Sequence, residues 1–84
     1  MTSPFHGPVT SLDVRALLAE GNEPFDVIME AVQSLPPGGV LELTAPFEPV
    51  PLYKVLGGLG FVHRAFRRGA AEVVVYFSQG SAEG

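Results

Sequence analysis

The segment from residue 23 to residue 39 restricts the fold more than any other part of the chain. It reads EPFDVIMEAVQSLPPGG, with apolar side chains at helical spacing followed by two prolines and two glycines. The apolar stripe consists of Phe25, Ile28, Val32 and Leu35, which is one face of an amphipathic helix. Asn22 is a good N-cap, and Glu23 and Asp26 fall in the first turn, where the helix dipole favours negative charge. The PPGG run ends this helix.

Strand patterns lie on both sides of the helix. The run VTSLDVRA before it and the run VLELTAPF after it both alternate with a period of two residues. The next run, EPVPLYKVLGGLG, predicts a short second helix with Pro51 in its first turn and Gly60 just past its end. Gly57 and Gly58 are interpreted as residues that let this helix pack closely against a sheet.

The remainder of the chain predicts two more strands. FVHRAFRR alternates poorly and is rich in arginine, which suits an edge strand protected by charge. AEVVVYF is apolar on both faces, which suits an interior position. Its first face carries Val73, Val75 and Phe77, and its second face carries Val74 and Tyr76. The order of elements is therefore βαβαββ.

This order predicts an α/β two-layer sandwich. Right-handed crossovers make the first three strands parallel, and the short RRGA link makes the fourth strand antiparallel. The expected sheet is mixed and four-stranded, in the order 1-2-4-3, with both helices on one face. Val74 and Tyr76 lie on the open face, where a homodimer could form. We expect a single domain over residues 9–78, a flexible N-terminal arm at 1–8 and a flexible tail at 79–84.

Composition argues against several classes of function. The chain has no cysteine, which excludes disulfides and thiolate metal sites. A net charge of −4 argues against nucleic-acid binding. No segment approaches the ~18 apolar residues of a membrane span, and the first residues lack a signal-peptide pattern, so we expect a cytoplasmic protein with no membrane partner. His6 lies in the arm and His63 at the start of the third strand, so no metal or other cofactor is expected.

One edge of the predicted sheet is the expected place for a site. The carboxyl ends of parallel strands and the helix N-termini gather there, and such N-termini attract anions. The candidate ligand- or partner-binding residues at this edge are Arg15, Asn22, Glu23, Glu48, Arg67 and Arg68. Glu23 and Glu48 form the one plausible pair for acid–base work, although helix capping and charge–dipole stabilisation explain them more simply. For the arginines, the simpler interpretation is a soluble edge strand.

The stretch LDVR, followed by EPFDVIMEAVQSLPPGGVLEL, resembles the TusA-like (SirA-like) sulfur-carrier superfamily. Members of that superfamily begin with an LDLRG-type strand, carry Cys-Pro-x-Pro at the start of the first helix and adopt a βαβαββ fold. The continuation FEPVPLYKVLGGLGF is similar to an uncharacterised branch in which an HDP-x-PLY-like stretch leads the second helix. The resemblance covers about residues 11–77, and it implies the same fold as the order of elements does.

The departures from that superfamily concern its chemistry. Where the superfamily has Cys-Pro-x-Pro, this chain reads GNEP, so that Gly21 stands at the sulfur-carrying cysteine and Pro24 keeps its place. A persulfide needs a thiolate, so sulfur transfer by this chain is excluded. Phe47 stands where the branch often has histidine, so that no metal or haem role can be carried over.

These observations predict a non-enzymatic TusA-like domain that has lost the sulfur-carrying cysteine. Its expected role is to bind a protein partner, a second copy of itself or a small ligand. The alternative is a small enzyme or an anion-binding site at the helix-start edge, using Glu23, Glu48 and the arginines. A binding module predicts an apolar patch, whereas an enzyme predicts a concave cleft with a carboxylate of perturbed pKa.

Overall fold

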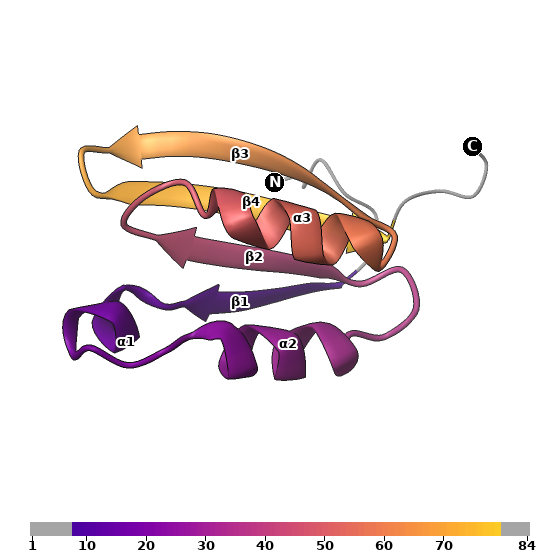
Figure 1. Cartoon of the computed structure of the whole chain (residues 1–84). Helices are drawn as coiled ribbons and strands as arrows, with labels where there is room; N and C mark the ends of the chain where they lie inside the picture. Colours follow the sequence, from indigo (N-terminus) through magenta and orange to yellow (C-terminus); the bar gives the residue numbers. More distant parts are fainter. Residues whose placement is uncertain (1–7, 80–84) are drawn as a thin grey trace.

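A four-stranded sheet with helices on one side forms the fold (Figure 1). This computed structural model describes residues 8–79. Its elements in chain order are β1 (Val9–Asp13), α1 (Arg15–Ala19), α2 (Phe25–Gln33), β2 (Val40–Ala45), α3 (Val50–Gly58), β3 (Phe61–Gly69) and β4 (Glu72–Gln79). Gln79 is thus the last residue of β4 and not the first residue of a tail. The rest of the predicted tail, and the predicted arm apart from Pro8, lie outside the described residues.

The pairing of the strands matches the prediction. β1 is parallel to β2, and β4 lies antiparallel between β2 and β3, which gives the order β1-β2-β4-β3. α2 and α3 lie on the same side of the sheet (Figure 1). The predicted α/β architecture and its strand order are therefore confirmed.

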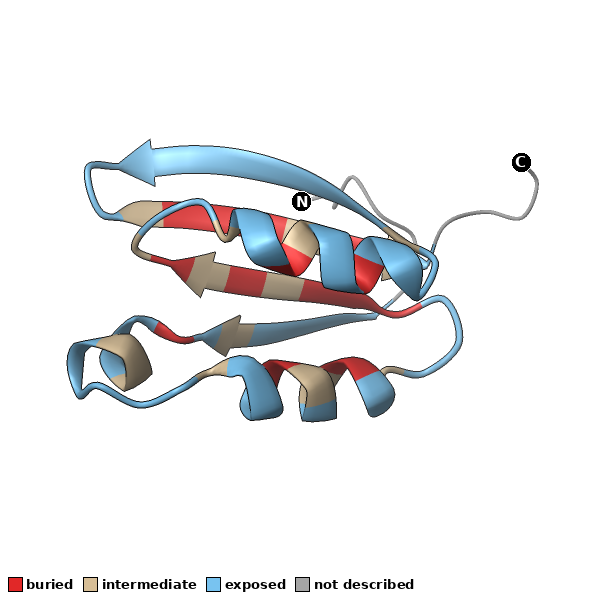
Figure 2. Ribbon diagram, viewed as in Figure 1, coloured by how far each residue is buried: buried red, intermediate tan, exposed pale blue. Residues whose placement is uncertain are grey.

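The core lies between the two central strands and the two longer helices, as Figure 2 shows. β4 contributes Val73, Val75 and Phe77 to it, as the alternation predicted. α2 contributes Ile28 and Val32, and α3 contributes Leu52 and Leu56. β2 and β4 are central, and even their apolar side chains Val40 and Val74, on the face without helices, expose only 2% of their surface because a strand flanks them on each side. β3, like β1, is an edge strand, and the residues of both are largely exposed.

The first correction concerns α1, where the sequence predicted the end of a strand and a loop. β1 ends at Asp13, whose carboxylate accepts the backbone N–H of Arg15 at 3.0 Å. This turn bends the chain out of the extended conformation, and the alanines and leucines that follow are strong helix formers. Leu17 and Leu18 pack against the core, so that tertiary contacts hold a helix too short to be stable alone.

Gly21 ends α1 in the left-handed conformation, with φ at +82°. Its N–H donates to the carbonyl of Leu18, and the N–H of Asn22 donates to the carbonyl of Leu17. These two hydrogen bonds form the Schellman arrangement, in which glycine is the favoured residue. The position that the superfamily resemblance assigns to cysteine therefore has a backbone role here.

Two further sequence interpretations are wrong. α2 has Pro24 at its N-cap and no side-chain cap, because the Asn22 amide donates to the carboxylate of Glu20 at 3.3 Å instead. Gly57 and Gly58 do not permit a close approach to the sheet, since a Cβ atom added at either would meet nothing within 4 Å. The prediction for Gly60 is correct, because it follows the C-cap of α3 with φ at +93°.

Candidate functional site

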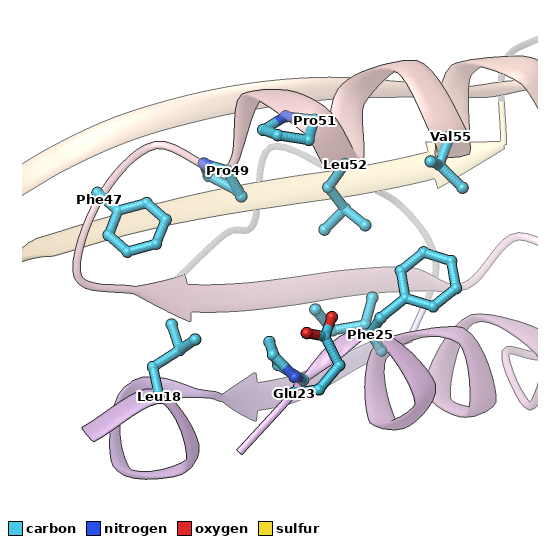
Figure 3. A pocket seen from close by; sticks show the side chains of 10 residues that line it. Leu18, Glu23, Phe25, Phe47, Pro49, Pro51, Leu52 and Val55 are labelled. Atoms are coloured by element: carbon cyan, nitrogen blue, oxygen red, sulfur yellow. The ribbon is translucent and has the colours of Figure 1, made fainter. Parts of the chain in front are cut away.

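The candidate site is an apolar depression between α2 and α3, which we call the inter-helix groove (Figure 3). Its volume is about 290 Å³. Its lining residues are Leu18, Glu23, Pro24, Phe25, Ile28, Phe47, Pro49, Pro51, Leu52 and Val55. The groove exists because two helices cannot cover four strands: α2 contacts β1 and α3 contacts β3, which leaves a gap above the middle of the sheet.

The two walls of the groove come from two loop-to-helix junctions. One wall has Leu18 of α1 and Phe25 at the start of α2, and the other has Phe47 of the β2–α3 loop and Val55 of α3. Ile28, which is buried, forms part of the floor. Prolines at both junctions hold the backbone in fixed conformations, because their φ angles are restricted. The backbone of each junction is therefore restricted by its own sequence.

Large apolar side chains at this groove are exposed to solvent. Phe47 exposes 54% of its surface, and Phe25 and Val55 each expose 39%. Single exposed apolar residues are ordinary, but three that line one concavity form a contiguous apolar surface. Concave apolar surfaces with few polar groups are typical of binding sites.

Glu23 is the one ionisable side chain that lines the groove within residues 8–79. Figure 3 shows its carboxylate pointing between the two walls. Among the described residues, it forms no ion pair and receives no hydrogen bond. The groove therefore combines an apolar lining with one uncompensated negative charge.

A second, smaller pocket of about 140 Å³ holds Glu48 and Arg67 together with Ala65 and Val73. The Glu48 carboxylate accepts a hydrogen bond of 3.0 Å from the Tyr53 hydroxyl. Burial raises the pKa of Tyr53, and the bond to Glu48 raises it further. Arg67 donates to the carbonyls of Gly69 and Ala70, at 3.3 and 3.4 Å.

His63 is a packing residue of the helix-covered face. Its ring stacks on that of Tyr53 with a centroid distance of 3.6 Å and an interplanar angle of 8°. Both rings also contact Phe77, at about 6 Å. This stack fixes α3 over β3. His6 lies outside the described residues, and no group of three potential metal ligands occurs between residues 8 and 79.

Arg15 does not take part in either pocket. Its guanidinium forms a bidentate pair with Asp13, with a shortest distance of 2.7 Å, and lies 3.9 Å from Glu72. The same hydrogen bonds hold the pKa of Asp13 below its ordinary value. Arg15 therefore stabilises the β1–α1 turn.

The open face of the sheet carries a polar network that the sequence did not indicate. The Glu42 carboxylate accepts hydrogen bonds from Ser11 at 2.6 Å and from Tyr76 at 2.7 Å. These bonds, and then the charge of Arg68, lower the pKa of Glu42, while the bond to Glu42 raises the pKa of Tyr76. Val74, which was assigned to a dimer face, exposes only 2% of its surface and offers a partner little.

The predicted site residues are thus distributed over several places. Glu23 lies in the inter-helix groove, Glu48 and Arg67 share the smaller pocket, and Arg68 lies near the open face. Glu23 and Glu48 line different pockets. The apolar residues of the groove were not predicted as a site.

Comparison with protein families places this chain. Residues 11–79 match the uncharacterised conserved protein family DUF2249. The chain belongs to this family. No curated protein and no solved structure was found to match it. In the described part of this DUF2249 chain, no helix is long and apolar enough to cross a membrane. Every residue that lines the inter-helix groove falls within the DUF2249 match.

Proposed function

We propose that this DUF2249 chain is a non-enzymatic binding domain that holds an apolar group in the inter-helix groove. One observation carries the proposal: Phe25, Phe47 and Val55 are exposed and line one concavity. Filling that concavity would remove apolar surface from water, which contributes about 25 cal/mol per Å². The groove contains a single carboxylate and no second group for acid–base or nucleophilic chemistry among the described residues, so binding is the role that its lining favours.

The superfamily relation is part of the same proposal. The strand order and the position of the groove at the start of α2 support a cysteine-less branch of the TusA-like superfamily. In such a branch the helix-start edge keeps a binding role although the reactive sulfur is gone. Gly21, at the position of the missing cysteine, serves the turn between α1 and α2.

The test is a titration of the ¹⁵N-labelled full chain with 1-hexanol, followed by NMR. Amide shifts should concentrate on the residues that line the groove. The decisive variant is Val55→Glu, which adds a charge to the lining, and its matched control is Val50→Glu, an exposed valine of the same helix that does not line the groove. Hexanol shifts that survive in V55E as well as in V50E would refute the proposal.

A second candidate function uses the smaller pocket. Glu48 and Arg67 face it with opposite charges, and no ion pair joins them. A small zwitterion, such as a free amino acid, would match both charges. Glycine should then shift the amides near residues 48 and 67 in the native chain and in Arg64→Gln, but not in Arg67→Gln. Equal responses in the two variants would exclude this candidate.

Self-association through the open face of the sheet is a third role that we propose for testing. The registers place Arg64 and Phe66 at one side of that face, and Glu42 toward the other. A two-fold axis parallel to the strands would set the basic side of one copy over the acidic side of the other. Phe66, which exposes 46% of its surface, would then be covered.

A further inference from the structure

We propose that the inter-helix groove binds a segment of a partner protein in which an apolar side chain lies next to a lysine or arginine. This inference rests on the proposed function and adds the chemistry of the occupant. It follows from the charge, the size and the exposure of the groove.

The charge argument starts from Glu23. Its carboxylate is exposed and has no counter-ion among the described residues, and no lysine or arginine lines the groove. Lys54 belongs to α3, but it is not one of the lining residues. An apolar occupant would remove water from the Glu23 carboxylate, and the loss of hydration opposes binding. A positive charge on the occupant offsets that loss, whereas a negative charge adds repulsion.

Carboxylates around the groove also favour a basic occupant. Glu20 lies in the chain between the groove residues Leu18 and Glu23, and Asp26 and Glu30 lie on α2. In the described part of the chain, none of these three carboxylates forms an ion pair. The summed field at this side of the molecule is therefore negative, which attracts basic segments and repels acidic ones.

The size of the groove is compatible with a peptide anchor, since it lies at the lower limit of ligand pockets. Pockets for drug-sized ligands range from about 300 to 1,000 Å³. A groove of about 290 Å³ accommodates one or two side chains. Phe25 and Phe47 stand at opposite walls, and aromatic side chains in such positions often dominate protein–protein binding.

The experiment compares three capped tripeptides, Leu-Phe-Lys, Leu-Phe-Gln and Leu-Phe-Glu. Each is titrated into the ¹⁵N-labelled full chain, with 1-hexanol as a neutral apolar reference. The lysine peptide should bind about 1.5- to fivefold more tightly than the glutamine peptide, the range that an exposed ion pair contributes. The glutamate peptide should bind most weakly. The preference should fall much more in Glu23→Gln than in Glu30→Gln, since Glu23 lines the groove and Glu30 contributes only to the surrounding field. Equal losses in the two variants would overturn the role of Glu23.

The other outcomes contradict the partner segment, the proposed function or the charge selection, as follows. If hexanol shifts the groove amides and no peptide does, the partner segment is wrong and the proposed function stands. If neither shifts them, the proposed function fails as well. Equal binding of the three peptides would overturn the charge selection. Shifts of the groove amides with protein concentration alone would identify a second copy as the occupant. Hexylammonium is titrated as a further probe, and if it binds more tightly than the lysine peptide, the occupant is a small amine and not a protein segment.

Discussion

Replacement of Gly21 by alanine should destabilise the protein, whereas replacement of Gly57 by alanine should stabilise it. Both positions are open, because a Cβ atom would meet nothing within 4 Å at either of them. Packing therefore cancels from the comparison, and only the backbone conformation differs. Gly21 has φ at +82°, and Gly57 lies within α3.

The expected magnitudes follow from these conformations. A left-handed residue with a Cβ atom costs roughly 1–2 kcal/mol, of which the smaller entropy of the unfolded alanine chain returns part. We expect Gly21→Ala to lower the free energy of unfolding by about 1 kcal/mol. Gly57→Ala should raise it by about 0.5 kcal/mol, since alanine favours the helix but the position is close to its end. Gly38→Ala, with φ at +78° and open surroundings, should behave like Gly21→Ala.

Urea unfolding of the three variants, followed by circular dichroism, measures these differences. With a slope near 1 kcal/mol per M for a small domain, the midpoints of the Gly21 and Gly57 variants should be separated by roughly 1.5 M. A Gly21→Ala variant as stable as the native chain would refute the assignment of Gly21 to a Schellman turn. Gly21→Cys should lose as much stability as Gly21→Ala, so that a thiol cannot be restored at this position without cost.

Three further predictions concern the core, the polar network and self-association. Phe77→Ala should cost about 3–5 kcal/mol, because the side chain is buried at the centre of the core; a thermal midpoint within a few degrees of the native one would contradict this. Glu42 has a lowered folded-state pKa, so its stabilisation is present above the ordinary glutamate value of about 4.3 and is lost as the pH falls through the lower folded value. Glu42→Gln should therefore lose less stability than the native chain between pH 5 and pH 2. If the thermal midpoints of the two proteins fall equally over this pH range, the prediction is wrong. In light scattering, the mass should rise from 8.9 kDa toward twice that value with concentration, and Phe66→Lys should prevent the rise; a constant monomer mass would remove the open-face dimer.

The strands and their order could be predicted because several independent restrictions agree. Val73 to Phe77 are apolar on both faces, so β4 had to be central, while the arginines of β3 required an edge. The short link between these strands then fixed their antiparallel pairing. Each conclusion depended on patterns within one strand or on one connection, and such patterns do not require knowledge of distant contacts.

α1 could not be predicted, because no pattern within its own residues identifies it as a helix. A helix of five residues is too short to show a period, and its first residues continue the alternation of β1. The Asp13 carboxylate, which turns the chain, is compatible with a strand until its bond to the Arg15 N–H is known. Asn22 was misassigned as a consequence, since the end of α1 places its amide next to Glu20 and not at the start of α2.

The inter-helix groove could not be predicted from the apolar periodicity of the helices. The stripe on α2 correctly gives the side that faces the sheet, and Ile28 is buried as expected. Phe25 belongs to the same stripe but remains exposed, because its burial depends on how close α3 lies. Tyr53 of α3 stacks on His63 of β3, and we infer that this stack contributes to the position of α3 and so to that spacing. Since this contact joins a helix to a later strand, no local pattern predicts it. If the stack sets the width of the groove, Tyr53→Leu should alter the binding of hexanol although Tyr53 does not line the groove.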